Sequence, residues 1–376
     1  MTRPLPTTAE EIWRYSRIDE LDLAAYSPAT APTSTDSTLP APLAALKDRV
    51  PDAAVVFVRN GHVVSSDLDV AGSTPAPEAL DAFGDLHREH SPGPVVLRAT
   101  DKPVVVLHWT EGDGVATYPH LVIDAPEDSD VDVYEHSASD DDTIALTVPI
   151  TEIRANAAAR VRYLHGQLLG CRTWQIGRQV SSVDRDATLT TGAVALGGDY
   201  ARLRIESSLT GRGAHGEMLA AYFGEQRQMH DIRTLQDHVA PNTESNLLFK
   251  GAVEGLAQSI YTGLIHIGKQ ASGVNAFQTN RNIKLSEGAW AHSDPNLEIE
   301  NNDVRCSHAS TIGPVDEEQR FYLESRGVRP QVAERLIVMG FFDDVLNRLR
   351  APQAAIATLR DEIERKLSRR EDEVPR

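Results

Sequence analysis

Cys306, Ser307 and His308 form the segment of this sequence whose residue types and spacing most clearly suggest chemistry. If the segment is a strand, residues two apart face the same side, so the thiol of Cys306 and the imidazole of His308 project side by side. Thiolate and imidazole together suit iron, zinc or copper, because sulfur supplies the soft ligand. Two ligands do not complete a metal site, so the others would come from a partner or from sulfide. The alternative is that Val304, Cys306 and His308 merely continue the inward face of a final coil.

The other motifs point away from catalysis by this chain alone. The segment from Gly211 to Gly216 matches the G-x-G-x-x-G dinucleotide pattern, but no β-α-β pattern surrounds it, which favours a turn. The sequence has no G-x-x-x-x-G-K-[ST] phosphate loop, no G-x-S-x-G and no H-E-x-x-H. The second cysteine, Cys171, is expected to be a buried, small apolar residue.

Short strands must position the cysteine and histidine. The step Asn60-Gly61 between two apolar runs predicts a hairpin. Over residues 92–313, runs rich in Val, Ile, Leu and Thr follow one another without a long helical pattern, and in the later part they recur roughly every 15 residues. These runs fit either a β-sandwich or a stack of parallel coils. Tight hairpin signals are rare after residue 92 and runs such as 260–267 are apolar on both faces, which favours a parallel β-helix.

The C-terminal part reads as helical. Asp316 and Gln319 make a capping-box-like pattern, Gly327 marks the end of that helix, and Pro330 fits the first turn of the next. Apolar residues in the second helix recur at three and four residues, which predicts one apolar face. Its Phe341-Phe342 pair suits either a docking surface or packing within a small helical domain.

The charge balance limits the partners. Lys and Arg number 37 and Asp and Glu number 55, which gives a net charge of −18. A surface with this much negative charge repels phosphate backbones and anionic headgroups. Neither nucleic acid nor a membrane is therefore expected as a partner. The acidic segment 127–142 is expected to be a solvated loop. The start lacks the apolar region of a signal peptide and no apolar run approaches a membrane span, so we expect a cytoplasmic protein.

Six segments, in a fixed order, carry a family signature: Thr279–Asn282, Leu285–Gly288, Pro295–Ile299, Asp303–Gly313, Asp316–Gly327 and Ala333–Phe342. Together they resemble the SufB/SufD family of iron–sulfur cluster assembly proteins. Within that family, the segment Cys306–Thr311 is more similar to the SufD branch than to the SufB branch. The resemblance is looser over residues 92–278.

The resemblance implies a mainly β fold in three parts. Residues 1–91 would form an N-terminal α/β domain with a linker, residues 92–313 a right-handed parallel β-helix core, and residues 314–376 a C-terminal helical domain. The expected role is a non-catalytic scaffold that pairs with SufB through the β-helix and docks the SufC ATPase through the C-terminal helices. A SufB-like homodimeric scaffold is the alternative, and a β-helix carbohydrate-active enzyme is a more distant one.

The resemblance also assigns residues. His308, with Cys306 beside it, would lie at the SufB interface as an iron ligand or proton-handling group, and SufB would complete the site. No cofactor is expected to bind stably; iron or a nascent iron–sulfur cluster would be held there transiently. The residues expected to dock SufC are Leu336, Met339, Phe341, Phe342 and Val345.

Overall fold

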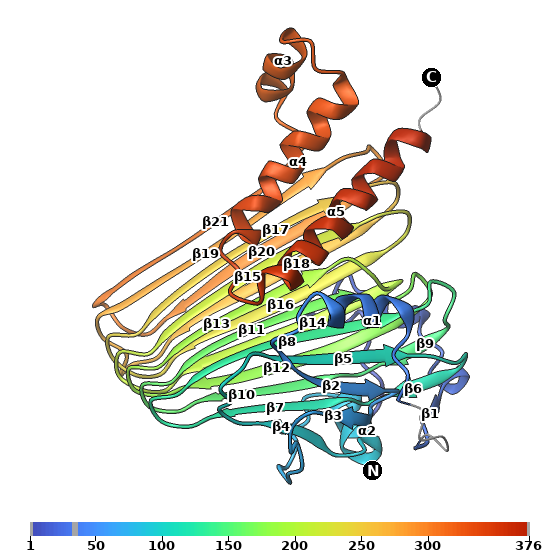
Figure 1. Ribbon diagram of the computed structural model, residues 1–376. Coiled ribbons are helices and arrows are strands. Elements are labelled where there is room, and N and C mark those ends of the chain that lie inside the picture. The colour runs from blue at the N-terminus through green and yellow to red at the C-terminus, as the bar shows by residue number, and fades with distance from the viewer. Residues whose placement is uncertain (1–2, 32–36, 374–376) are drawn as a thin grey trace.

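The chain folds into a long stack of β-coils whose outer faces are covered by helices (Figure 1). The structure, a computed structural model, describes residues 3–31 and 37–373. In these residues the strands form two sheets of 11 and 10 members, and all strands pair in parallel except for one hairpin. The predictions of a mainly β fold, a parallel β-helix core and helices at the C-terminal end are confirmed.

Each coil contributes a strand to both sheets. Sheet A contains β1 (Ser27–Pro28), β4 (Pro94–Leu97), β6 (Val115–Thr117), β7 (His120–Ala125), β9 (Ala145–Thr147), β10 (Ile150–Ala155), β12 (Trp174–Val183), β14 (Tyr200–Leu209), β16 (Met229–His238), β18 (Gln258–Ile267) and β20 (Trp290–Ile299). Sheet B contains β2 (Ala54–Arg59), β3 (His62–Ser66), β5 (Val104–Thr110), β8 (Asp130–Ser139), β11 (Arg160–Leu168), β13 (Thr188–Ala195), β15 (His215–Gly224), β17 (Glu244–Val253), β19 (Val274–Lys284) and β21 (Val304–Gly313). The helices are η1 (Glu11–Trp13), η2 (Ile18–Glu20), η3 (Leu23–Ala25), α1 (Ala41–Asp48), α2 (Ala82–His90), α3 (Glu317–Ser325), α4 (Pro330–Leu346) and α5 (Gln353–Glu373).

Side chains alternate between the interior of the stack and its outer faces. The inward column Val131, Val161 and Leu189 is typical, because these residues are register partners in three successive coils and are all buried. Side chains at equal positions of neighbouring strands lie about 4.8 Å apart. The interior core is therefore built from stacked columns, one residue per coil.

One corner of each coil uses a left-handed backbone. Asp128, Ala158, Asp186, Gly213 and Asn242 have positive φ and occupy the same corner in successive coils. Each also donates its N–H to a carbonyl of the next coil, at 2.7 to 3.2 Å. The glycine-rich segment that matched the dinucleotide pattern is one of these corners, and a strand rather than a helix follows it. The predicted turn is confirmed.

The predicted hairpin is also present. β2 and β3 pair antiparallel across Asn60 and Gly61, both of which have positive φ. This backbone is the one that a two-residue hairpin loop requires. β2 also pairs in parallel with β5, so the hairpin extends sheet B.

Residues 130–139 of the acidic segment 127–142 form strand β8 and only the two ends of the segment are turns, so the prediction of a solvated loop is wrong for most of it. Its charges alternate with Val131 and Val133, which face the interior. The outward Asp130 pairs with Arg160 on the neighbouring strand at 3.0 Å. Acidic and apolar residues alternate in this segment, and this period of two is typical of a half-buried strand, although the number of acids alone suggested a loop.

One acid of this strand, Glu135, is buried inside the stack. His108 Nε2 lies 2.9 Å from its carboxylate, and the Tyr163 hydroxyl donates a hydrogen bond to it. Burial alone would raise the pKa of this carboxyl, but these contacts and the nearby His165 outweigh burial and lower the pKa to about 2. Glu135 is therefore an ionised group in the interior.

The N-terminal segment, residues 7–26, covers the outer face of sheet A. Trp13 is buried there against an aromatic cluster. Below it, the buried carboxylate of Asp231 accepts hydrogen bonds from Arg202 at 2.5 Å, Arg233 at 2.6 Å and the Tyr200 hydroxyl at 2.8 Å. The opposite charges lower the pKa of Asp231 against the effect of its burial.

The same two arginines hold the N-terminal segment in place. Arg202 donates to the Ile12 carbonyl at 2.6 Å, and Arg233 donates to the Arg14 carbonyl at 2.9 Å. The Arg202 guanidinium also lies 3.9 Å from the centre of the Trp13 ring. Asp231 thus orients two cations that fasten a segment about 200 residues away in the sequence.

The C-terminal helices begin and end as their sequence predicts. The Asp316 side chain accepts from the Gln319 N–H at 3.0 Å and caps α3, Gly327 has a φ of 85°, and Pro330 opens α4. α4 and α5 lie across the outer face of sheet B, whereas α3 projects beyond the stack (Figure 1). None of the described helices is long and apolar enough to cross a membrane.

Candidate functional site

The stack ends at two open strand edges, β20 and β21, which we call the open end. β20 pairs only with β18 and β21 only with β19, so in the described ranges the outer edge of each strand has no strand beside it. Apolar side chains line these edges: Leu297, Ile299 and Ile312 are 36%, 44% and 42% exposed. Free peptide groups beside apolar side chains are typical of a surface to which another chain adds strands.

Cys306 and His308 lie on the inward face of β21. Cys306 is half-buried and packs, with Val304, against Val274 and Ala276 of the previous coil. His308 is exposed, because no coil among the described residues covers it. The pair therefore continues the inward face of the final coil and is open to a partner at the same time. Partial burial raises the pKa of the Cys306 thiol, so the free thiol is protonated at neutral pH.

The open end holds too few ligands for a metal by itself. Among the residues that the structure describes, no group of three or more His, Cys, Asp or Glu side chains is placed to hold a metal ion. Near the pair, the Ser310 hydroxyl donates to the Ser293 hydroxyl at 2.7 Å and links the two sheets. Any metal at Cys306 and His308 must draw further ligands from outside this set.

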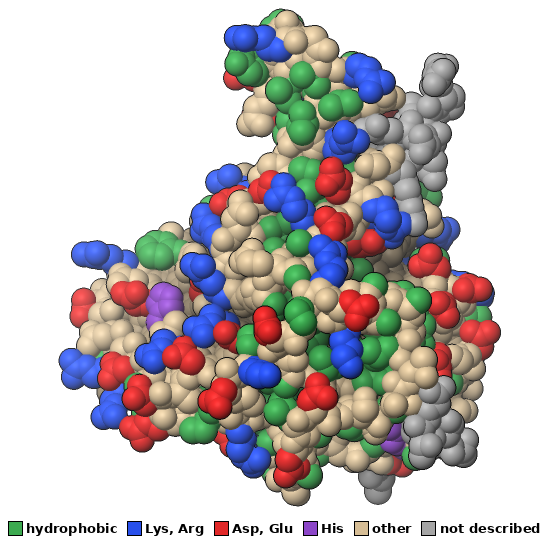
Figure 2. Space-filling view, viewed as in Figure 1, with side chains coloured by type: hydrophobic (Ala, Val, Ile, Leu, Met, Phe, Trp, Pro, Cys, Tyr) green, Lys and Arg blue, Asp and Glu red, His purple; other side chains and the backbone are tan. Residues whose placement is uncertain are grey.

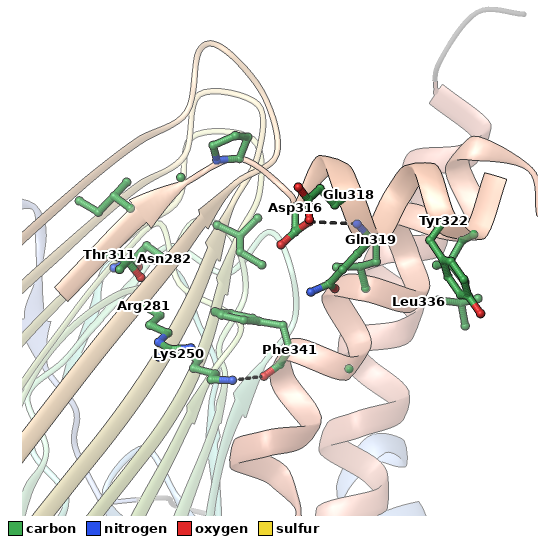
Figure 3. Close-up of a pocket in the computed structure, with 17 residues that line it drawn as sticks. Lys250, Arg281, Asn282, Thr311, Asp316, Glu318, Gln319, Tyr322, Leu336 and Phe341 are labelled. Atoms are coloured by element: carbon green, nitrogen blue, oxygen red, sulfur yellow. Dashed lines mark hydrogen bonds between the residues drawn. The ribbon is translucent and has the colours of Figure 1, made fainter. Parts of the chain in front are cut away.

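A second candidate surface lies where α3 and α4 leave the stack. A cavity of about 990 Å³ opens between these helices and the outer face of β17, β19 and β21 (Figure 3). Lys250 fixes one wall, since its ammonium donates to the Phe341 carbonyl at 3.0 Å and pairs with Asp344 at 2.8 Å. The hydrogen bond from Lys250 lowers the pKa of Asp344. The capped start of α3 forms the opposite wall.

The five residues expected to dock a partner are divided by the structure. Leu336 is 50% exposed and Phe341 is half-buried, and both line the cavity. Met339, Phe342 and Val345 are buried against sheet B and α5. The apolar face of α4 turns towards the apolar outer face of the sheet, so these three residues pack against the stack, whereas the alternative considered for Phe342 was packing within a small helical domain.

Two exposed aromatic residues on α3 were not predicted from the sequence to lie at a surface. Phe321 is 73% exposed and Tyr322 is 57% exposed. Hydrophobic side chains are visible on the projecting α3–α4 part in Figure 2. An adjacent aromatic pair in an otherwise charged helix was the available signal, because such residues rarely stay exposed without a partner.

Cys171 is exposed, so the prediction that it is buried is wrong. It lies in the loop between β11 and β12, where its thiol donates to the Asp141 carbonyl at 3.2 Å. The preceding Gly170 packs tightly on the neighbouring corner, where a Cβ would lie 2.0 Å from the Asp140 carbonyl oxygen. Burial of part of the side chain raises the pKa of this thiol, so Cys171 is not activated.

The comparisons with known proteins agree with the family signature. The family model for "SUF system FeS cluster assembly, SufBD core domain" matches residues 108–341. An iron–sulfur cluster assembly SufBD family protein of Mycobacterium tuberculosis is 31% identical over 93% of this chain and 86% of its own length. The iron–sulfur cluster assembly protein SufD of Escherichia coli is 26% identical over 92% of this chain and 86% of its own length. SufD of Bacillus subtilis is 29% identical over 66% of this chain and 57% of its own length.

Proposed function

Because the chain belongs to the SufBD family of iron–sulfur cluster assembly proteins, we propose that it is the SufD-type scaffold subunit of a SufBCD complex. It pairs with SufB through the open end and docks the SufC ATPase through its C-terminal helices. ATP hydrolysis resides in SufC, and this chain contributes to cluster assembly and iron handling. Relatives named SufD support the choice within the family.

The open end is the observation that carries this proposal. Its two strand edges have free peptide groups, and its exposed apolar side chains are Leu297, Ile299 and Ile312. A partner that presents similar edges would pair with both strands and bury these side chains. Cys306 and His308 would then face the partner across the junction.

Iron or the nascent cluster is cargo at this junction. Cys306 supplies a soft thiolate once iron displaces its proton, and the imidazole of His308 acts beside it as an iron ligand or as a proton-handling group. SufB and sulfide complete the ligand set, which accounts for the presence of only two candidate ligands here. The cluster is therefore held between subunits and leaves when they separate.

The cavity beside α3 and α4 supports the ATPase-docking part of the proposal. Leu336 and Phe341 line it, and Phe321 and Tyr322 add exposed aromatic surface on the projecting helix. Aromatic side chains that are exposed on one chain are frequent anchors of protein interfaces. We assign these four residues, rather than the buried face of α4, to SufC.

Native mass spectrometry of the complex purified through this chain tests the proposal. The expected mass contains this chain, one SufB and two SufC subunits. His308→Ala should leave that mass unchanged and abolish the bound iron and acid-labile sulfide. Ser307→Ala is the matched control, because its side chain lies on the opposite face of β21 and is exposed.

Other masses would redirect the assignment. A homodimer that carries the cluster without SufB would support a SufB-like scaffold. A lone monomer without ATPase would refute the scaffold role, and polysaccharide turnover by that monomer would revive the carbohydrate-active alternative.

A further inference from the structure

A layer of amide side chains lies directly inside the open end. Gln278, Asn280 and Asn282 of β19 face the interior and are 1%, 0% and 3% exposed. In the previous coil, the register partners of the first two are the apolar Leu247 and Phe249. The interior therefore changes from apolar to amide in a single step, immediately before the outermost coil.

Two of the three amides in this layer, Asn280 and Asn282, are hydrogen-bonded to each other and to Tyr222. The Tyr222 hydroxyl donates to Asn282 Oδ1 at 2.7 Å and accepts from Asn280 Nδ2 at 3.0 Å, while Asn282 Nδ2 donates to Asn280 Oδ1 at 2.7 Å. Gly251 leaves room for the phenol, because a Cβ there would lie 2.0 Å from the Tyr222 ring. Such a closed network rigidifies the layer.

Gln278 is held in a similar way but keeps a free donor. Its Oε1 accepts from the Tyr261 hydroxyl at 3.2 Å, and that hydroxyl lies 3.1 Å from Thr234 Oγ1. Gly263 leaves space for this contact, because a Cβ there would lie 2.2 Å from the Tyr261 oxygen. Gln278 Nε2, in contrast, is buried and has no hydrogen-bond partner among the described residues. A buried donor without an acceptor has lost its hydrogen bonds to water without replacement, so we expect an acceptor to reach it.

His308 is the side chain placed to supply that acceptor. It is the register partner of Gln278, on the same inward face and one coil further out. Inward side chains at register positions are about 4.8 Å apart, within reach of an imidazole that rotates inwards. His308 is exposed, so its side chain can turn either towards solvent or inwards. A partner that covers the open end would leave it the inward orientation.

We infer that Gln278 is a positioning residue, whose amide N–H donates to one imidazole nitrogen of His308 when the open end is covered. This inference rests on the proposed function. In a neutral imidazole one nitrogen accepts and the other carries the proton. With the inner nitrogen occupied by Gln278, the outer nitrogen presents an N–H to the junction. His308 then donates a hydrogen bond to a sulfide or thiolate of the cargo instead of ligating iron, and no proton is transferred.

Variants of Gln278 in the purified complex test the inference. Gln278→Met keeps the volume, removes the donor and should lower cluster content about tenfold at unchanged subunit mass. Gln236→Met is the matched control, because Gln236 is also buried with an unpartnered amide atom but lies two strands inside sheet A. Its cluster content should equal that of the wild type. Equal losses in both variants would indicate a structural role and overturn the inference.

Gln278→Glu separates the two possible roles of the outer nitrogen. A carboxylate accepts the imidazole proton, so it would turn the lone pair outwards and create an iron ligand. We expect this variant to lose cluster about as strongly as Gln278→Met. The ¹⁵N shifts of His308 in the histidine-labelled complex should also show opposite tautomers for wild type and Gln278→Glu.

The controls distinguish failure of the inference from failure of the proposed function. Wild-type cluster content in Gln278→Met or Gln278→Glu would overturn the inference, and so would an identical tautomer in both complexes. If His308→Ala still abolishes the cluster in that case, the proposed function stands. If His308→Ala also retains the cluster, both fail. Should Gln278→Met not fold, the tautomer comparison with Gln278→Glu decides.

Discussion

Replacing Asp231 with alanine should both destabilise the fold and release the N-terminal segment. In the folded chain its carboxylate is fully buried and bridges the guanidinium groups of Arg202 and Arg233. Asp231→Ala leaves both cations buried with no opposite charge beside them. Removing one member of a buried ion network in this way costs about 3–5 kcal/mol of the free energy of unfolding.

The position of the two arginines means that Asp231→Ala should affect the N-terminal segment more than the rest of the fold. Their other nitrogens donate to the carbonyls of Ile12 and Arg14 in the N-terminal segment. Without Asp231 the two guanidinium groups lose the anion that orients them, so these contacts will weaken. We therefore expect faster amide exchange in the N-terminal segment than in the solenoid strands, even in conditions where the variant stays folded.

Urea unfolding followed by circular dichroism measures the first effect, and hydrogen exchange with mass spectrometry of peptides from residues 7–26 measures the second. Asp237→Ala is the control, because Asp237 lies on the same strand, is partly exposed and contacts His266 at 2.7 Å. It should cost less than about 1 kcal/mol. A loss below about 1 kcal/mol for Asp231→Ala, or unchanged exchange of residues 7–26, would refute the reasoning.

Two further predictions concern the interior and the helical layer. Glu135→Gln removes a carboxylate whose pKa in the folded chain, about 2, lies below the value of about 4.3 in an unfolded chain. The ionised carboxylate stabilises the fold above about pH 4.3, so the stability advantage of the wild type over the variant should shrink as the pH falls from about 4.3 towards 2. Urea midpoints that differ equally at all pH values would contradict this prediction. Phe342→Ala leaves a cavity at a fully buried position of α4 and should lower the free energy of unfolding by about 3–5 kcal/mol in the same assay. Leu336→Ala changes a half-exposed position and should lower it by less than about 1 kcal/mol. This second substitution should instead weaken the binding of SufC, measured by calorimetry. Equal destabilisation by these two substitutions would contradict the division of α4 into a packing face and a docking face.

Local signals in the sequence predicted much of the fold. The capping pair Asp316 and Gln319, the φ-positive Gly327 and Pro330 fix the ends of the C-terminal helices through contacts within a few residues. The hairpin at Asn60 is local in the same sense. The parallel solenoid followed from runs that are apolar on both faces, because both faces of each strand are covered.

Features that depend on distant contacts were not predictable in this way. The burial of Phe342 depends on β15, more than a hundred residues earlier, where Phe223 packs 6.4 Å from its ring. The N-terminal segment is fastened by Arg202 and Arg233, which nothing in residues 7–26 indicates. Glu135 looked solvated because a count of charge cannot show which side of a strand faces inwards.

At the candidate site, the alternation of β21 placed Cys306 and His308 on one face, as their spacing predicts. The pattern could not show that this strand is the last of the stack, because the absence of a following coil is a property of the whole topology. Gln278 was equally hidden, since it lies 30 residues before His308 and becomes its neighbour only through the pitch of the coil.

The two open edges also bear on how the cell must handle this subunit. A solenoid whose described residues end in two uncovered strand edges offers a template to which another chain with a free strand can add, including another copy of itself. Natural sheet proteins usually blunt such edges, whereas here Leu297, Ile299 and Ile312 remain uncovered. Under the proposed pairing with SufB, supply of the chain must match supply of SufB, and surplus copies should be substrates for chaperones and proteases rather than a stable reserve.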